Sequence, residues 1–295
     1  MSNVFPEERT ALVSMIKVTK KDWDSSRISK GHKVSRGHGM TRRMRTVFAI
    51  AALAVAVAGC GRDKINYFEA DVSVLYSKAR EFMDAGQYRF AAVTFDEIER
   101  QHPYSLWARR ATLMAAYNHY LSNDYDTAIL SAQRFLALHP GNEHAPYAYY
   151  MIASCFYEQI ADVNRDQMLT EQALRAFSEL VRRYPDSEYA SDARLKIELA
   201  QDHLAGKEMT VGRFYMNAKE YLAAVNRFQI VIEKYETTSH VPEALHRLVE
   251  NYLSLGVYPE AEKAAAVLGH NYPRSTWYRA SYDLLTSEGL SPADG

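Results

Sequence analysis

Few residues of this chain have the type and spacing of a catalytic, phosphate-binding or metal-binding motif. The sequence has no glycine-rich phosphate loop, no His-Glu-x-x-His pair and no Cys-x-x-Cys pair. His139 with His144, and His240 with His246, are five and six residues apart, so neither pair lies on one helical face as a zinc pair would. The carboxylates are numerous but scattered, and none is singled out as a general acid or base. We therefore predict no catalytic residue, no metal site and no enzymatic activity.

Cys60 is the exception, because its thiol directly follows an export signal. Three arginines, Arg42, Arg43 and Arg45, precede an uncharged apolar run that ends in small residues. The run is shorter than the roughly 20 apolar residues of a membrane-spanning helix. Val57-Ala58-Gly59-Cys60 resembles the bacterial lipobox, at which a peptidase cleaves before a cysteine that carries diacylglycerol. We expect Cys60 to become the first mature residue and to carry a covalent lipid; the alternative is an ordinary cleavage site beside an incidental cysteine.

The residue after this cysteine bears on which membrane holds the lipid. In sorted lipoproteins, which the segment resembles, an aspartate there retains the protein at the inner membrane, whereas this chain has Gly61. We expect the anchor in the outer membrane and the body in the periplasm, with membrane contact through the lipid alone and no cofactor besides it. The second cysteine, Cys155, falls on an apolar helical face and is predicted to be a small core residue.

The segments around the signal define the amino-terminal organisation. Residues 1–39 are polar and basic, without a periodic apolar pattern. Because an export signal normally begins near the initiator, we interpret them as a gene-model extension before a start at Met40 or Met44. A long n-region that begins at Met1 is the alternative. Residues 40–59 are then the lipoprotein signal peptide, and residues 60–69 a lipidated linker.

Removal of the signal changes the charge balance. Of the 35 Lys and Arg and the 36 Asp and Glu in the chain, 11 and 4 precede Cys60, which leaves 24 and 32 and a net charge of −8. Binding of nucleic acid needs an excess of Lys and Arg on one face, so the acidic mature chain argues against it. The balance suits a protein that binds other proteins.

From Ala70 onward the sequence predicts a series of helix pairs. It is rich in Ala, Leu, Glu, Arg and Tyr and has no sustained alternating apolar pattern. Prolines are expected to end the helices, because proline lacks an N–H and clashes with the preceding turn. A Ser or Asn after each proline is expected to cap the next helix. The prolines are Pro103, Pro140, Pro185 and Pro273, and the expected caps are Ser105, Asn142, Ser187 and Ser275.

The spacing within the pairs resembles the tetratricopeptide repeat. In that repeat a small residue of the first helix precedes an aromatic one, and Ala, Phe and Pro follow in the second helix. The small positions are Ala79, Ala116, Ala153, Gly212 and Val249, and the alanines are Ala91, Ala128, Ala173, Ala224 and Ala261. Four of these alanines follow a tyrosine by three residues: Tyr88, Tyr125, Tyr221 and Tyr258. The predicted fold class is all-α, a solenoid of five helix pairs over residues 70–286. It ends in a capping helix from Ser275 to Leu285, before a disordered tail at 287–295.

Two units are longer than the others. The third has about eight extra residues, around Ala161 to Met168, and the fourth has about fourteen, which would lengthen the helix between Ser187 and Lys219. We expect a hinge near Gly206 or Gly212, since glycine inside a helix costs about 1 kcal/mol.

Taken together, these features resemble the BamD (ComL) family of outer-membrane β-barrel assembly lipoproteins. The most specific stretches are Asp166-Gln167, Ala173 to Phe177, Leu180 to Tyr189 and Tyr221 to Phe228. The resemblance implies a non-enzymatic periplasmic scaffold of the BAM complex. Its partners would be the soluble repeats of a BamA-like barrel insertase, accessory assembly lipoproteins and nascent outer-membrane barrel proteins.

The resemblance also implies a partner-binding surface. Asn226 and Arg227 match a Val-Asn-Arg stretch whose arginine is associated with an acidic side chain on the insertase, and a guanidinium offers a bidentate fork for a carboxylate. The alternative is that Arg227 pairs only within its own helix. Phe214 and Tyr215 lie where the family has aromatics implicated in substrate contact, although Tyr215 also occupies a repeat core position.

A second surface is expected near the amino-terminal end. His102, Tyr104 and Trp107 would form a pocket for an aromatic-ended barrel peptide, or pack between the first two units. The family usually has Tyr-Pro where this chain has His102-Pro103.

Two other kinds of repeat protein compete with this interpretation. A secretin pilotin lipoprotein shares the lipobox and the repeats, but not the insertion near Ala161 or the Val-Asn-Arg stretch. A Tol-associated or cell-division repeat adaptor shares the Tyr-Pro period, but typically has an amino-terminal coiled coil and no lipobox.

Overall fold

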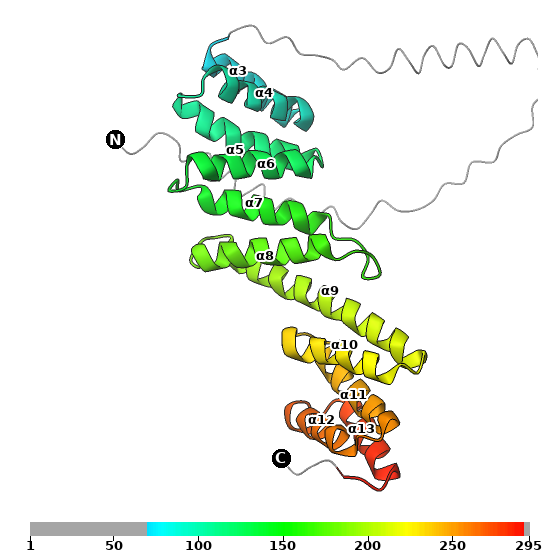
Figure 1. The fold of residues 1–295 in the computed structure, drawn as a ribbon. Helices are drawn as coiled ribbons and strands as arrows, with labels where there is room; N and C mark the ends of the chain where they lie inside the picture. Colours follow the sequence, from blue (N-terminus) through cyan, green and yellow to red (C-terminus); the bar gives the residue numbers. More distant parts are fainter. Residues whose placement is uncertain (1–69, 292–295) are drawn as a thin grey trace, which may run out of the picture. The chain divides into compact units, whose positions relative to one another are not determined.

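The computed structural model describes residues 70–291, which form eleven α-helices and no strand (Figure 1). The helices are α3 (Val72–Asp84), α4 (Tyr88–Gln101), α5 (Leu106–Leu121), α6 (Tyr125–Leu138), α7 (Ala145–Glu158), α8 (Met168–Arg183), α9 (Ala190–Asn217), α10 (Tyr221–Lys234), α11 (Val241–Leu255), α12 (Tyr258–Asn271) and α13 (Thr276–Ser287). The predicted extension, signal peptide and linker, with Cys60, lie outside the described residues.

Residues of the predicted repeat pattern mark several helix ends. The four repeat tyrosines are the first residues of α4, α6, α10 and α12. Helices α4, α6, α8 and α12 end at a C-cap residue that directly precedes a proline, as expected because proline disfavours the helical conformation of the residue before it. Ser105 and Ser275 cap α5 and α13 by accepting backbone N–H groups at 3.0 Å.

The other two expected caps are wrong. Asn142 bonds the N–H of His144, which is itself the N-cap of α7, so the asparagine shapes the preceding turn instead. α9 begins after Tyr189, and the Ser187 hydroxyl is buried without a hydrogen-bond partner.

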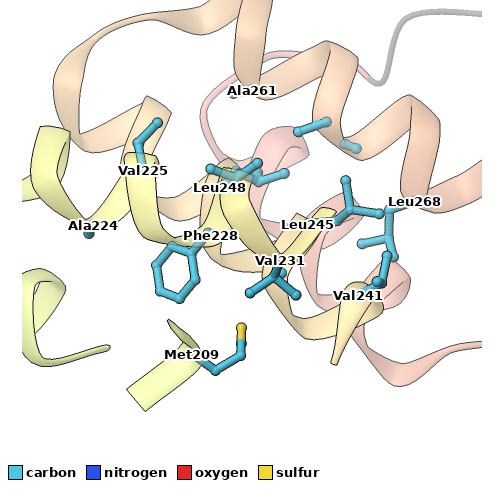
Figure 2. Close-up of a cluster of buried hydrophobic side chains, with 14 of the residues drawn as sticks. Met209, Ala224, Val225, Phe228, Val231, Val241, Leu245, Leu248, Ala261 and Leu268 are labelled. Atoms are coloured by element: carbon cyan, nitrogen blue, oxygen red, sulfur yellow. The ribbon is translucent and has the colours of Figure 1, made fainter. Parts of the chain in front are cut away.

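Consecutive helices pack against each other, and α13 packs on α11 and α12. The predicted small residues of the first helices and the alanines of the second helices are buried, with Phe95, Phe177 and Phe228 fully enclosed beside them. This arrangement confirms an all-α tetratricopeptide-repeat solenoid of five helix pairs and a capping helix. Figure 2 shows the core of the last pairs, where Phe228, Val231, Leu245 and Leu268 converge.

The long third and fourth units take different forms. The extra residues of the third make a loop, residues 159–167, between α7 and α8, whereas those of the fourth make α9 a continuous helix of 28 residues. The expected hinge is wrong, because both glycines are buried contact points within this helix. A Cβ at Gly212 would lie 2.5 Å from Phe228 Cε1, so the glycine allows close helix packing.

The carboxyl-terminal boundary also differs from the prediction. Beyond α13, Gly289 has φ +73° and the Leu290 N–H bonds the carbonyl of Leu285. Leu290 packs against the core, so order extends past residue 286, while residues 292–295 of the predicted tail lie outside the described part. Between residues 70 and 291, no helix has the length and apolar character needed to cross a membrane.

Candidate partner-binding site

Arg227 lies on α10 and faces its neighbour α9. Its Nη1 donates to Glu208 Oε2 at 3.1 Å, and the arginine side chain is 40% exposed. The ion pair joins two helices, so the alternative of a pair within α10 is not what the structure shows. Asn226, one residue earlier, is exposed. The Arg227 side chain is therefore partly open to solvent while its Nη1 is bonded to Glu208.

Phe214 and Tyr215 differ in their surroundings although they are neighbours. Phe214 is 68% exposed, whereas Tyr215 is partly buried against the carboxyl-terminal core. Their ring centroids are 5.7 Å apart at an interplanar angle of 69°. Phe214 is thus available to a partner, and Tyr215 fills the repeat position that its spacing predicts.

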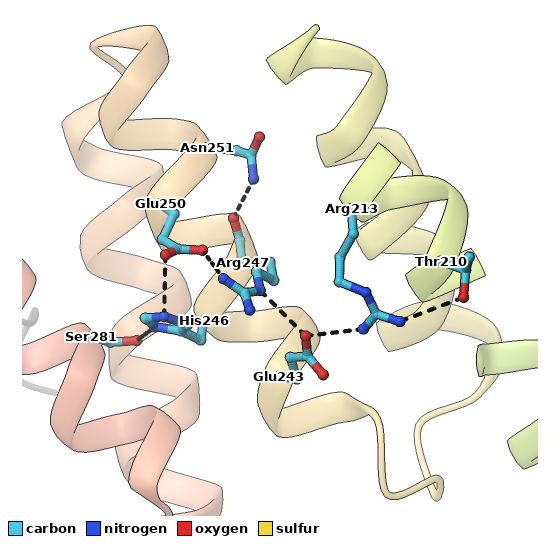
Figure 3. A network of polar contacts seen from close by, with 8 residues as sticks. All are labelled: Thr210, Arg213, Glu243, His246, Arg247, Glu250, Asn251 and Ser281. Atoms are coloured by element: carbon cyan, nitrogen blue, oxygen red, sulfur yellow. Dashed lines mark hydrogen bonds and ion pairs between the residues drawn. The ribbon is translucent and has the colours of Figure 1, made fainter. Parts of the chain in front are cut away.

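A network of ion pairs and hydrogen bonds joins α9, α11 and α13 (Figure 3). Glu243 accepts from Arg213 of α9 at 3.1 Å and from Arg247 at 3.3 Å. Arg247 also donates to Glu250 at 2.8 Å. His246 lies 3.5 Å from Glu250 and bonds the Ser281 hydroxyl of α13 at 2.8 Å. The network ties the last repeat and its capping helix to the long helix.

The ionisation of this network follows from its contacts. Burial works against the charge of Glu250, but hydrogen bonds from His246 and Arg247 prevail and hold the pKa of that carboxyl below its ordinary value. Burial likewise disfavours the charge of Arg247, yet the bonds to Glu250 and Glu243 raise its pKa. The Arg247 guanidinium also lies over the Trp277 ring, 5.4 Å from its centroid. Sequence reasoning missed this network, because its partners are up to 35 residues apart.

The three amino-terminal candidates do not share one environment. His102 Nε2 is 2.8 Å from the carbonyl oxygen of Ala70, which ties the start of the described chain to the end of α4. Trp107 lies against Tyr76 of α3, with ring centroids 4.8 Å apart. Tyr104 is fully exposed in the turn between them. His102 and Trp107 thus have packing roles, and Tyr104 alone offers its whole ring to solvent.

Residues 70–291 offer neither a cluster of metal ligands nor an exposed thiol. Within residues 70–291, no three His, Cys, Asp or Glu side chains gather in a way that could hold a metal ion. Cys155 is fully buried, as predicted, and burial raises the pKa of its thiol to about 12.

Comparison with known proteins places the chain in a family. Residues 68–268 match the profile YfiO, described as outer membrane lipoprotein. The outer membrane protein assembly factor BamD of Caulobacter vibrioides is 52% identical over 255 residues, covering 84% of each chain. BamD of Rickettsia prowazekii is 42% identical over 238 residues, covering 80% of this chain and 95% of its own.

A solved thermophilic TPR protein of Thermus thermophilus is 19% identical, with a TM-score of 0.34, and covers 72% of this chain and 98% of its own. The repeat fold assigned above rests on the helix pairs themselves. Both curated relatives are named for assembly and not for catalysis. By profile and by sequence identity, this chain belongs to the family of outer membrane lipoproteins that includes the assembly factors BamD.

Proposed function

We propose that this protein is a non-enzymatic scaffold lipoprotein of the outer-membrane β-barrel assembly machinery. The observation that carries the proposal is 52% identity to an outer membrane protein assembly factor across 84% of the chain. A repeat solenoid supports it further, because such folds present extended surfaces to protein partners. The lipid on Cys60 would hold the solenoid at the periplasmic face of the outer membrane.

The proposed contact with the barrel insertase centres on Arg227. A guanidinium with one nitrogen bonded at 3.1 Å to Glu208 still has donors for a second carboxylate. An acidic side chain on the insertase's periplasmic repeats would share the arginine with Glu208. Exposed Asn226 and Phe214 would add polar and apolar contacts. Tyr215 would support Phe214 from the core side.

Nascent barrel proteins and accessory lipoproteins are the other proposed partners. Tyr104, in the exposed turn before α5, is the amino-terminal residue best placed to meet an aromatic-ended barrel peptide. His102 and Trp107 would then hold the turn in place rather than line a pocket.

Depletion of the protein tests the assembly role. Levels of outer-membrane barrel proteins should fall as the protein is depleted, and a copy carrying Cys60→Ala should restore them poorly because the body is no longer anchored. Unchanged barrel levels after depletion would contradict the proposal.

A charge reversal tests the contact separately. Arg227→Glu should weaken co-purification of the insertase, whereas Arg175→Glu is the matched control, because Arg175 is an exposed arginine paired with a glutamate on α8. Equal recovery with both variants would remove Arg227 from the interface and leave the assembly role standing.

A further inference from the structure

The two insertions that lengthen the third and fourth repeats meet in the structure. The loop 159–167 follows α7, and the extra turns belong to α9. Val163 of the loop lies 3.9 Å from the position of a Cβ on Gly206, and Lys207 Nζ donates to the carbonyl of Asn164 at 3.2 Å. The loop therefore lies against the middle of the long helix.

A second loop reaches the same turn of α9 from the carboxyl-terminal repeats. In residues 235–240, between α10 and α11, Ser239 Oγ donates to Asp202 Oδ1 at 2.9 Å. His240 Nε2 lies 3.6 Å from Asp202 Oδ2 and 3.3 Å from the position of a Cβ on Gly206. Both loops thus approach α9 at Gly206, where an added Cβ would press on the His240 ring and reach ordinary contact with Val163.

The insertion loop 159–167 is held in one conformation by hydrogen bonds from a buried side chain. Gln167 is buried, and its Nε2 donates to the carbonyl oxygens of Asp162, Val163 and Arg165 at 3.0 to 3.2 Å. Its Oε1 accepts from Thr170 of α8 at 2.9 Å. The Gln167 side-chain amide therefore bonds three carbonyls of the loop backbone and links the loop to α8. This gives the Asp166-Gln167 stretch a structural role.

The position of these contacts on α9 matters because the two core clusters use different parts of the helix. The cluster around Phe177 reaches α9 at Ala193 and Ile197, whereas the cluster around Phe228 begins at Ala205. Loop 235–240 contacts Asp202, and loop 159–167 contacts Lys207. The two sets of contacts meet at Gly206, at the start of the second cluster.

We propose that loops 159–167 and 235–240 form a clamp on residues 202–207 of α9, which fixes the angle between helices α3–α8 and helices α10–α13. The clamp is independent of the assembly role and of any partner. It makes the solenoid one rigid body, so surfaces on its two ends keep a constant separation.

Spin labels on the two groups of helices test this proposal. A ketone-bearing amino acid in place of Ser178 on α8 and of Ser254 on α11, both exposed, would carry the labels and leave both cysteines unlabelled. Double electron–electron resonance on the full-length protein should give one narrow distance distribution. Gln167→Leu and Asp202→Ala, which act on opposite loops, should each broaden it.

Gln229→Leu is the matched control, because Gln229 bonds Tyr252 within the carboxyl-terminal repeats and lies outside the clamp. It should leave the distribution narrow. Hydrogen exchange of α9 amides 200–210 should accelerate roughly tenfold in the clamp variants. Asp202 is half-exposed, so Asp202→Ala keeps the test valid if Gln167→Leu fails to fold. Narrow distributions in folded clamp variants would overturn the proposal, because α9 alone would then set the angle.

Discussion

The third repeat and the last two repeats use the same helix-pair packing but fill the space around it with different chemistry. Around α7, the rings of Tyr147 and Tyr150 both lie against the Tyr189 ring, with centroid distances of 5.5 and 5.2 Å. Lys196 enters this group, bonding Tyr150 Oη at 2.8 Å and pairing with Asp192. Around α11 the core is mainly aliphatic, and the polar contacts are the ion pairs of Arg213, Glu243, Arg247 and Glu250.

The repeat pattern therefore specifies only the contact within a pair. The small residue and the enclosed phenylalanine recur in both regions, as Ala173 with Phe177 and Ala224 with Phe228. What joins one pair to the next varies, because those side chains meet residues 30 or more positions away. The two regions should therefore respond alike to changes in the shared pattern and differently to pH.

The largest effect is expected from truncating the shared phenylalanines. Phe177→Ala and Phe228→Ala should each lower the free energy of unfolding by about 3–5 kcal/mol, because each removes a fully buried ring. Chemical denaturation of the two variants would measure both losses. A loss in only one region would show that the pairs do not share one packing rule.

A smaller loss is expected where helices approach most closely. Gly212→Ala should cost about 1–3 kcal/mol, because the new Cβ would clash with the Phe228 ring. Gly141→Ala, in the loop before α7, is the control, because a Cβ there meets nothing within 4 Å. Thermal unfolding of both variants would check this, and an equal stability of the two would contradict the role assigned to Gly212.

High pH should destabilise the tyrosine-rich region first. Burial raises the pKa of Tyr147 well above its ordinary value of 10.0, so the stability it contributes is complete below pH 10 and is lost as the pH rises toward the folded value. The melting temperature should therefore fall above pH 10, and less steeply in Tyr147→Phe. Identical slopes for the two proteins would contradict this assignment.

Low pH should act on the ion-pair region, with the smallest effect. The pKa of Glu250 is below its ordinary value of 4.5, so its contribution is present above pH 4.5 and is lost as the pH falls toward the folded value. Glu250→Gln should lower stability at neutral pH and reduce the loss on acidification. Melting temperatures of the unmodified protein and of Glu250→Gln, at pH 7 and in acid, would check this. A decrease of the same size at both pH values would argue against the network.

The sequence predicts the helix pairs because their signals are local. Prolines, tyrosines and small residues at fixed spacing indicate where α4, α6, α10 and α12 begin or end, and which alanines are buried. The two glycines of α9 misled the prediction, because helix propensity favours a break at Gly206 or Gly212 whereas tertiary contacts with His240 and Phe228 require small residues there.

The surroundings of the candidate partner-binding residues could not be predicted from the sequence. Exposure of Phe214 and burial of Tyr215 depend on which face of α9 meets the core, and the bond from Arg227 to Glu208 joins residues 19 apart. The exposed position of Tyr104 and the bond from His102 to Ala70 likewise follow from how the turn after α4 folds.

Affinity purification of the tagged full-length protein from gently solubilised envelopes would identify its partners and so test the assembly role. Partners would be identified by mass spectrometry, with an untagged strain as the control. Recovery of a large barrel protein with soluble periplasmic repeats is the predicted result. Recovery of a secretin or of Tol components in its place would contradict the assembly role and favour a pilotin or a cell-division adaptor.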